Sequence, residues 1–436
     1  MPSLLLKKIK DKTAKIAIVG LGYVGLPLAV QKAKAGFSVI GIERKRERVD
    51  MVNKGKTYIP DIVGDELKNV VKEKKFKATQ SFNSISEVDI ICICVPTPLT
   101  KHKEPDTQYI ESVTDKMLPY LHKNQLIILE STSYPGTTEE IILPKIQNAG
   151  FKVGKDFYLA FSPERIDPGN KKYRLTNTPK IVGGVTPKCT QLAEALYKQV
   201  IKEKIHKVSS PKVAEMEKLL ENVFRNVNIA LVNELTILCQ RMGVSIWEVI
   251  EAAKTKPYGF MPFYPGPGLG GHCIPVDPFY LAWKAKEYSF NTRFIELAGE
   301  INDNMPYYIV ERVTKILNQQ KKCISDANIL ILGVAYKKDI GDIRESPVLK
   351  IIELLEKGGA NTKYNDPYVS SFSLKEKEYR SVKLDDTVVE KQDLVIITTD
   401  HSLYDYQKIV NSARLIFDTR NATKNIKEGR EKIYLL

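Results

Sequence analysis

The feature that most constrains the fold is a glycine-rich turn between an apolar run and a helix-like segment. Residues 15–20 (KIAIVG) form a short apolar run, and residues 23–35 follow with apolar side chains at helical spacing. Between them lies Gly20-Leu-Gly22-Tyr-Val-Gly25. A strand, a tight glycine turn and a helix in this order are typical of a nucleotide-binding βαβ unit. The sequence therefore predicts a parallel sheet with helices on both faces.

Each glycine of this turn has its own physical reason. The first permits the tight turn, the second lets backbone N–H groups approach a pyrophosphate, and the third lets the helix pack on the strand. Glu43 ends the next apolar run, where its carboxylate can accept hydrogen bonds from both ribose hydroxyls and would repel a 2′-phosphate. The turn therefore predicts NAD rather than NADP, a preference that Arg44 and Arg46 weaken. The alternative is a tight turn that binds no ligand.

The rest of the chain predicts two Rossmann-like regions around a helical centre. In the first region, helix-length segments separate buried-strand candidates at 37–43, 89–95, 125–132 and 157–163. A second alternating region begins with residues 328–336, continues with 363–368 and 393–400, and finishes with 414–420. From Ser210-Pro211, a capping serine followed by proline, neither glycine nor proline interrupts the chain until Gly243, which predicts one long spine helix.

This alternation gives a specific domain prediction. We expect an α/β protein with two Rossmann-like parallel-sheet domains joined by a helical central domain that contains the spine helix. The predicted bounds are 1–209 for the NAD-binding Rossmann domain, 210–320 for the central domain with a cysteine-bearing loop, and 321–436 for the C-terminal Rossmann-like domain.

Composition narrows the function classes. The formal net charge is +14, but Lys and Arg are spread without a run of five or more, so we expect a lysine-rich surface and no nucleic-acid partner. The longest apolar runs are far shorter than a membrane span and the N-terminus lacks a signal-peptide pattern, so we expect a cytoplasmic protein without a membrane partner. The six cysteines lack C-x-x-C spacing, so we expect neither a metal site nor a disulfide framework.

One cysteine lies in a segment that suits a catalytic thiol. Residues 262–281 (PFYPGPGLGGHCIPVDPFYL) are too rich in proline and glycine for anything but a loop, and such loops carry functional groups on a fixed scaffold. Cys273 follows two glycines, which allow close backbone approach to a ligand, and His272 and Asp277 bracket the thiol with titratable groups. The alternatives are a buried free cysteine and a structural histidine.

The predicted spine helix carries a second polar pair. Lys218 and Asn222 are spaced i, i+4 and therefore project from one face of the helix. An ammonium and an amide together can stabilise an oxyanion or alkoxide. The alternative is a solvated lysine on an amphipathic helix.

Over essentially its whole length the chain resembles the UDP-glucose and UDP-N-acetylhexosamine 6-dehydrogenases. The matching motifs occur in the family's order and spacing. They are GLGYVGLPLA (20–29), CVPTP (94–98), ESTSYPGTT (130–138), FSPERIDPGN (161–170), AEMEKLLENVFRNVNIALVNE (214–234), PGPGLGGHCIPVDP (265–278) and GVAYKKDIGDIRESP (333–347).

The resemblance implies roles for particular residues. The catalytic set is the nucleophile Cys273, the charge-stabilising Lys218 and Asn222, Asp277 in support of Lys218 and the hydrolytic water, and Thr132 with Glu164 as a water-positioning and acid/base pair. The implied NAD contacts are Gly20, Gly22, Tyr23, Val24, Gly25, Glu43, Thr97, Thr132 and Arg344. The implied UDP-sugar contacts are Glu164, Arg165, Lys218, Asn222, Phe260, Tyr264, Gly270 and Lys337, with the C-terminal domain as the UDP-sugar-binding part.

The resemblance also implies the reaction and the assembly. Two hydride transfers to NAD would convert the C6 alcohol of a UDP-sugar to a carboxylate through a thiohemiacetal and a thioester on the cysteine. The product would be a precursor of surface polysaccharides, and the enzyme a homodimer or larger homo-oligomer. Residues 254–257 contain no arginine to match the one that a neighbouring subunit contributes in the family.

The identity of the sugar rests on a departure from the UDP-glucose members. They commonly carry a second glutamate four residues after the one that matches Glu164, whereas this chain has Pro168 there and Arg165 directly after the glutamate. The motifs therefore look closest to the UDP-N-acetyl-D-glucosamine enzymes, with UDP-N-acetylmannosamine and UDP-glucose 6-dehydrogenases as alternatives.

Two other classes compete with this interpretation. The two-domain β-hydroxyacid dehydrogenases share a Rossmann domain and a helical lysine, but they transfer one hydride and need neither a cysteine loop nor a third domain. A basic nucleic-acid-binding or scaffold protein would use only the positive charge, and it predicts strongly salt-dependent binding to DNA or RNA.

Overall fold

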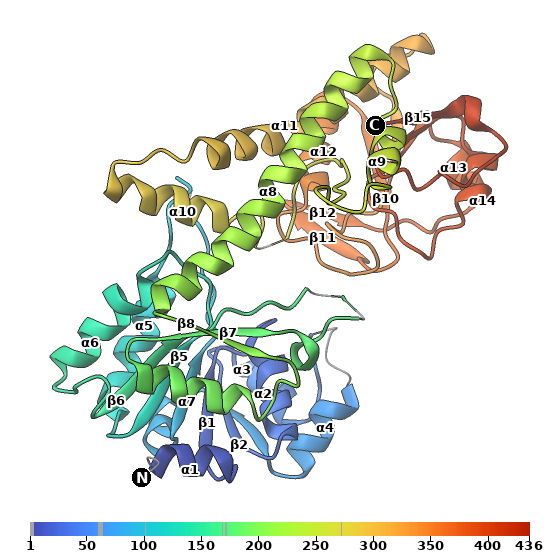
Figure 1. The fold of residues 1–436 in the computed structure, drawn as a ribbon. Helices are drawn as coiled ribbons and strands as arrows, with labels where there is room; N and C mark the ends of the chain where they lie inside the picture. The colour runs from blue at the N-terminus through green and yellow to red at the C-terminus, as the bar shows by residue number, and fades with distance from the viewer. Residues whose placement is uncertain (1–3, 60–63, 101, 168, 171, 272) are drawn as a thin grey trace. The chain divides into compact units, whose positions relative to one another are not determined.

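The computed structural model describes residues 4–59, 64–100, 102–167, 169–170, 172–271 and 273–436 (Figure 1). His272 and Pro168 therefore lie outside the described residues. The contacts divide the chain into two compact units. Unit 1 is Met1–Glu221 with Trp283–Phe290, and unit 2 is Asn222–Ala282 with Asn291–Leu436.

Unit 1 is built on an eight-stranded sheet in the order β3-β2-β1-β4-β5-β6-β7-β8. Only the β6–β7 pair is antiparallel among these described strands. The strands are β1 (Lys15–Val19), β2 (Ser38–Ile42), β3 (Phe76–Thr79), β4 (Ile90–Ile93), β5 (Gln125–Leu129), β6 (Phe157–Phe161), β7 (Lys180–Gly184) and β8 (Ile205–Val208). The chain leaves β1 toward β3 on one side and continues from β4 on the other, which makes the β1–β4 junction the switch point of the sheet.

Helices cover both faces of this sheet because its strands are apolar on both sides. In β1, Ile16 and Ile18 contribute to one buried cluster, while Ala17 and Val19 contribute to the cluster on the opposite face. The first cluster includes residues of α1 (Leu4–Lys10), α2 (Gly25–Lys34), α3 (Arg46–Asn53), α4 (Gly64–Lys72) and α7 (Pro187–Tyr197), and the second includes residues of α5 (Gln108–Met117) and α6 (Leu143–Asn148).

Unit 2 contains a five-stranded sheet, β10-β9-β13-β14-β15, that is parallel throughout. Its strands are β9 (Asn328–Leu332), β10 (Asn361–Asn365), β13 (Leu394–Ile397), β14 (Ile416–Asp418) and β15 (Ile433–Leu435), and a separate hairpin joins β11 (Ser371–Leu374) to β12 (Lys377–Arg380). β9 shows the same alternation as β1, since Ile329 and Ile331 face one cluster and Leu330 and Leu332 the other. Helices α12 (Pro347–Lys357), α13 (Asp386–Glu390) and α14 (Tyr406–Ser412) cover this sheet.

The predicted spine helix is confirmed as α8 (Pro211–Met242), a single helix of 32 residues. The division between the two units falls within it. The remaining helices of the centre are α9 (Ile246–Ala253), α10 (Asp277–Ala285) and α11 (Arg293–Gln319), and α11 contains Pro306. The predicted fold class, parallel-sheet Rossmann-like regions with a helical centre, is therefore confirmed.

Candidate active site

The glycine turn has the geometry of a dinucleotide site. Gly20 adopts a left-handed φ of 92°, and a Cβ on Gly25 would lie 1.8 Å from the Gly20 carbonyl oxygen, so any side chain there would force α2 away from β1. Around Gly22, by contrast, an added Cβ would meet no atom of the described residues within 4 Å. Gly22 is thus the open position of the turn, where a pyrophosphate can approach the backbone. Tyr23 and Val24 lie beside it and pack on the core.

Glu43 lies just beyond β2, next to the turn. Its carboxylate is buried and accepts hydrogen bonds from the backbone N–H of Leu21 at 3.2 Å and of Lys45 at 3.0 Å, with the Arg48 guanidinium 3.8 Å away. Each carboxylate oxygen keeps acceptor capacity for a further hydroxyl. The contact with Leu21 also shows that Glu43 orders the glycine turn itself.

The other predicted cofactor contacts of unit 1 follow neighbouring strands. Thr97 follows β4 and is buried, and Thr132 follows β5 and is half-buried. Since β1, β4 and β5 are adjacent and parallel, their carboxyl ends bring the glycine turn, Thr97 and Thr132 to one edge of the sheet. This edge is where open α/β sheets bind ligands.

The Glu164 side chain accepts hydrogen bonds from three donors. Its Oε1 accepts the backbone N–H groups of Arg165 at 2.7 Å and Ile166 at 2.9 Å, and its Oε2 accepts Lys180 Nζ at 3.1 Å. These three contacts fix the orientation of the carboxylate and leave acceptor capacity on its oxygens.

Arg165, a predicted sugar contact, pairs with two glutamates of α8 that were not predicted as site residues. Its guanidinium bonds to Glu221, lies 3.7 Å from Glu217 and donates to the Pro179 carbonyl oxygen at 2.9 Å. Burial raises the pKa of Glu217 to about 7, and the negative charge of Glu221 and the hydrogen bond between the two side chains act in the same direction. Any sugar contact of Arg165 must therefore compete with two carboxylates.

Lys218 is buried on α8, although a solvated lysine was the alternative. Four residues further, Asn222 donates from Nδ2 to Asp277 Oδ2 at 2.6 Å, and both residues are buried. The Asp277 backbone N–H in turn donates to the Cys273 carbonyl oxygen at 2.8 Å. Asn222, Asp277 and Cys273, predicted independently along the chain, are thus brought together in unit 2.

Cys273 is exposed, in contrast to the buried Cys92, Cys94 and Cys189. The alternative of a buried free cysteine is therefore wrong for Cys273, and its catalytic role stays a prediction. Cys323 is exposed as well, on the short turn between α11 and β9, so exposure alone does not single out the nucleophile.

Two asparagines of α8 that were not predicted as site residues hold the cysteine loop at further points. Asn226 donates from Nδ2 to the Ile274 carbonyl oxygen at 3.1 Å. Asn233 donates from Nδ2 to Asn302 Oδ1 at 2.9 Å and accepts the Gly266 backbone N–H at 3.1 Å. Together with Asn222 these amides occupy one face of the helix at i, i+4 and i+11. They hold the loop on both sides of Cys273.

The loop that follows β9 packs against the cysteine loop. A Cβ on Gly270 would lie 2.4 Å from Tyr336 Cβ, and the Gly271 N–H donates to the Arg344 carbonyl oxygen at 2.9 Å. Lys337, the predicted substrate contact, directly follows Tyr336 and is half-buried. The Arg344 guanidinium itself pairs with Asp342 at 2.6 Å.

Phe260 and Tyr264, the predicted aromatic contacts, are both exposed. Tyr264 stacks on Trp247 with ring centres 6.2 Å apart, and its hydroxyl donates to Glu251 at 2.9 Å. Glu251 also pairs with Lys254, one of the residues in the segment where the family carries an arginine.

Arg420 was missed from the sequence. It follows β14, donates from Nε to the Thr398 carbonyl oxygen at 3.0 Å, and lies so close to Gly266 that an added Cβ there would meet Nη1 at 2.5 Å. Its guanidinium therefore lies against the cysteine loop at the carboxyl ends of β13 and β14. The signal available in the sequence was its position directly after a buried strand.

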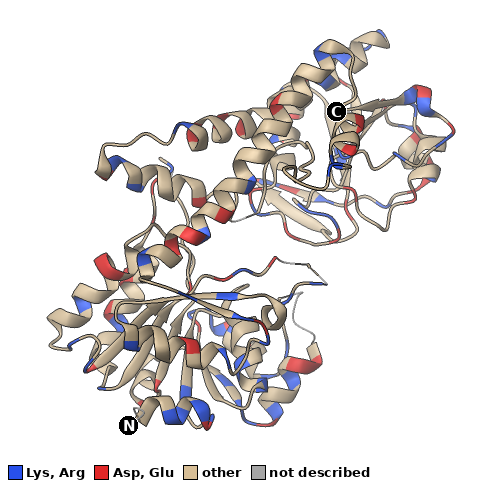
Figure 2. Cartoon of the chain, in the orientation of Figure 1, with Lys and Arg blue, Asp and Glu red and all other residues tan. Residues whose placement is uncertain are grey.

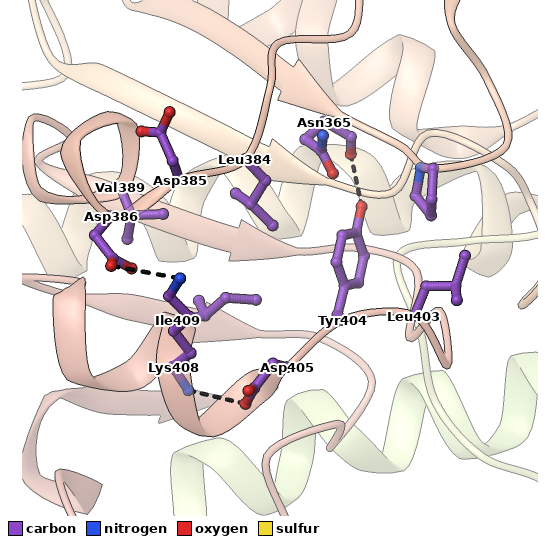
Figure 3. Close-up of a pocket in the computed structure, with 11 residues that line it drawn as sticks. Asn365, Leu384, Asp385, Asp386, Val389, Leu403, Tyr404, Asp405, Lys408 and Ile409 are labelled. Atoms are coloured by element: carbon purple, nitrogen blue, oxygen red, sulfur yellow. Dashed lines mark hydrogen bonds and ion pairs between the residues drawn. The ribbon is translucent and has the colours of Figure 1, made fainter.

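A pocket of about 330 Å³ lies elsewhere in unit 2, beside α13 and α14 (Figure 3). The Tyr404 hydroxyl donates to the Asn365 carbonyl oxygen at 2.8 Å, and Lys408 Nζ lies 3.5 Å from Asp386. Asp405 caps α14 through the Lys408 N–H. These polar groups satisfy one another, and the residues that line the pocket are other than the predicted site residues.

Figure 2 shows Lys and Arg interspersed with Asp and Glu over both units. No helix among the described residues is both long enough and apolar enough to cross a membrane.

A dinucleotide turn at the switch point of one sheet is typical of an oxidoreductase that uses a dinucleotide cofactor. Three segments match the family models of the UDP-glucose/GDP-mannose dehydrogenases: the NAD binding domain over residues 14–201, the central domain over 212–304 and the UDP binding domain over 330–425. The chain belongs to this family and is an NAD-dependent UDP-sugar dehydrogenase.

Relatives agree with this assignment over most of the chain. A UDP-N-acetyl-D-glucosamine 6-dehydrogenase of Pseudomonas aeruginosa is 36% identical, with 83% of this chain and 84% of the relative covered. A UDP-N-acetyl-D-mannosamine dehydrogenase of Pyrococcus horikoshii is 37% identical, with 94% and 96% covered. Among solved structures, the UDP-D-ManNAc dehydrogenase of P. horikoshii superimposes with a TM-score of 0.87 over 97% of this chain and 98% of that one, at 35% identity.

Proposed function

We propose that this enzyme oxidises the C6 alcohol of a UDP-N-acetylhexosamine, UDP-N-acetylglucosamine in particular, to the carboxylate, with Cys273 as covalent nucleophile. The observation that carries the proposal is the exposed Cys273 thiol on a loop that buried amides of α8 fix on both sides. A thiol at a defined position can trap an aldehyde that would otherwise be lost between the two oxidations.

The proposed reaction has four chemical changes. The alcohol loses a proton and a hydride to give the aldehyde. The Cys273 thiolate then adds to the aldehyde carbon, and the resulting alkoxide takes up a proton to form a thiohemiacetal. Loss of a second hydride from that carbon, with the hydroxyl proton, gives the thioester. Water then forms the new C–O bond, the C–S bond breaks, and Cys273 leaves as thiolate. NAD accepts one hydride in each oxidation, so one sugar consumes two cofactor molecules.

In this proposal, side chains of this protein stabilise the negative charges and accept the proton that these steps produce. Lys218 and Asn222 stabilise the alkoxide of the alcohol and of the thiohemiacetal, an effect worth several kcal/mol where water is excluded. Asp277, which accepts the Asn222 amide, fixes the orientation of that amide. Glu164 takes the proton of the attacking water, and Thr132 orients that water.

The remaining assignments concern binding. For NAD, the contacts are the glycine turn from Gly20 to Gly25, Glu43, Thr97, Thr132 and Arg344. For the UDP-sugar, they are Glu164, Arg165, Phe260, Tyr264, Gly270 and Lys337, to which we add Arg420 because its guanidinium lies against the cysteine loop. An arginine fork can bind a phosphate or a uracil carbonyl.

A panel of UDP-sugars tests the substrate and the stoichiometry together. We expect two NADH per sugar and a uronate product whose mass identifies the reaction. N-acetylmannosamine is the first alternative sugar, since a mannosamine dehydrogenase matches the chain as well as a glucosamine one does, and glucose is the second. One NADH per sugar would favour a two-electron β-hydroxyacid dehydrogenase instead.

We further propose a homodimer or larger homo-oligomer that works in the cytoplasm on precursors of surface polysaccharides, with functional domains at 1–209, 210–320 and 321–436. In unit 2, α8 exposes an apolar stripe at Phe224, Leu231, Leu235, Leu238 and Met242, which is more apolar surface than one helix face of a monomer normally presents. Light scattering after Leu235→Glu should show a smaller particle than wild type, and Leu403→Glu, at another exposed leucine, should not change the mass. A monomeric wild type would contradict the oligomer.

A further inference from the structure

Behind Glu164 lies a cluster of charges that the proposed reaction does not yet use. Lys180 Nζ bonds to Glu164 Oε2 at 3.1 Å and to Glu130 Oε2 at 2.8 Å. The Tyr197 hydroxyl donates to Glu130 Oε1 at 2.5 Å. The Lys32 and Lys180 amines lie 4.6 and 5.2 Å from the centre of the Tyr197 ring. All five side chains are buried.

The residues of the cluster come from separate elements of the fold. Lys180 begins β7, Glu130 follows β5, Tyr197 ends α7 and Lys32 lies in α2, so the fold brings together groups that are far apart in sequence. Lys180 bonds to both carboxylates, whereas the Lys32 amine lies over the Tyr197 ring. Burial alone would lower the pKa of the Lys180 amine, but the charges of Glu130 and Glu164 raise it above its ordinary value. Lys180 is therefore a permanent cation at neutral pH.

The two carboxylates compete for this one cation. Glu130 has the shorter contact with Lys180 and also a phenol donor, whereas Glu164 depends on Lys180 and two backbone N–H groups. In a buried environment a carboxylate within hydrogen-bond distance of a cation is held ionised, and a second carboxylate nearby opposes that effect. Because Lys180 Nζ bonds to both carboxylates, Glu130 weakens the electrostatic effect of Lys180 on Glu164.

We propose that Lys180 is a positioning residue that keeps Glu164 ionised and oriented as the base of thioester hydrolysis, and that Glu130 limits this effect. The proposal rests on the proposed role of Glu164. In the step concerned, the attacking water gives its proton to Glu164 while the C–O bond forms and the C–S bond to Cys273 breaks.

The charged and titratable groups around Glu164 restrict what else could produce a pH effect. They are Lys180, Glu130, Tyr197 and Lys32 from the cluster, and Arg165 with its partners Glu217 and Glu221 on α8. Among the side chains that the structure describes, Lys180 alone bonds to both carboxylates of the cluster. Variants at Lys180 and at Glu130 therefore address the proposal directly.

The test measures hydrolysis separately from oxidation. Enzyme in excess is mixed with UDP-N-acetylglucosamine, or with UDP-N-acetylmannosamine if the sugar panel selects it, and saturating NAD. Quenched samples are analysed by intact mass, and the decay of the covalent adduct gives the hydrolysis rate between pH 5 and 9. The pH at which this rate falls to half on the acid side is compared among variants.

Lys180→Met should move this acid limb to higher pH by about 1 to 3 units, because a neighbouring opposite charge is lost. Glu130→Gln should move it to lower pH, because Glu164 loses a neighbouring negative charge and no longer competes for Lys180. Lys180→Arg, which keeps the cation, should keep the limb near that of wild type. A purely structural role would slow all variants without opposite movements of the limb.

Two outcomes overturn the proposal: an unmoved limb in Lys180→Met, or a shift of Lys180→Met and Glu130→Gln in the same direction. If Lys180→Met does not fold, judged by its melting curve and NAD titration, an upward shift in Glu130→Gln decides against the proposal. Glu164→Gln distinguishes a failure of the proposed role of Glu164 from a failure of the proposed role of Lys180. If that variant hydrolyses the adduct at the wild-type rate, the role of Glu164 itself is wrong; if it accumulates adduct while the other variants behave alike, only the role of Lys180 fails.

Discussion

Replacing Asn233 by alanine should loosen the cysteine loop and destabilise unit 2. The Asn233 amide is fully buried and makes two hydrogen bonds, to Asn302 Oδ1 at 2.9 Å and from the Gly266 N–H at 3.1 Å. Alanine leaves both partners without Asn233, and each unsatisfied buried group costs about 1 to 3 kcal/mol. Partial relaxation of the loop makes a total of about 2 to 4 kcal/mol reasonable.

The same helix offers a matched control. Asn228 is also an asparagine of α8, but its amide donates to the Phe224 carbonyl oxygen of its own helix, and within the described part of the chain it bonds to no loop. Alanine has the higher helix propensity, so Asn228→Ala should leave stability unchanged or raise it by about 0.5 kcal/mol. The difference between the two variants therefore isolates the attachment of the loop.

Calorimetry and thiol labelling measure the two consequences. For a unit of this size, the expected loss lowers the melting temperature of the affected transition by about 5 to 15 °C. Labelling of Cys273 with a disulfide reagent should become faster in Asn233→Ala, measured on a Cys323→Ser background because Cys323 is also exposed. NAD titration should give the wild-type affinity, since the glycine turn lies in unit 1. Equal melting temperatures and labelling rates in both alanine variants would refute the reasoning.

Three further predictions concern single positions. Gly22→Ala should fold with the wild-type melting temperature yet bind NAD at least about 10-fold more weakly in a fluorescence titration, because its methyl group meets only the ligand, whereas Gly25→Ala should lower the melting temperature because it strikes the turn. Cys273→Ser should form no thioester adduct in intact-mass spectra and produce no uronate, and normal turnover in this variant would rule out covalent catalysis. Burial raises the pKa of Glu215 to about 7, so the folded state retains a proton that the unfolded chain loses at lower pH; unit 1 should lose up to about 3 kcal/mol of stability between pH 4.5 and pH 7, and Glu215→Gln should flatten that dependence in melting curves.

The sequence was sufficient for elements with one dominant physical signal. The central parallel strands are continuous apolar runs and α8 lacks internal glycine or proline, so their existence follows from patterning. β7 (KIVGG) and β8 (IHKV) were not predicted, because glycines and charged residues hide short strands whose stability comes from pairing with β6 and with each other. The hairpin of β11 and β12 is similarly polar.

The same distinction applies to the residues of the candidate site. Cys273, the glycine turn and Glu43 lie in local patterns that carry their own chemical meaning, and they could be predicted. Asn233 could not, because an isolated amide on a helix resembles any other polar residue until the fold brings it against a loop.

Buried charge is the property that local patterns describe least well. Lys180 precedes an apolar run and counts, in composition, as one more of the basic residues behind the +14 charge, yet it is buried against Glu130 and Glu164. Screening by water reduces an exposed lysine of this chain to a small effect on any neighbour, whereas the same charge without water acts strongly on the two carboxylates within hydrogen-bond distance. The surplus of surface charge therefore says little about this enzyme's chemistry, and the charges removed from water govern how its proposed base behaves.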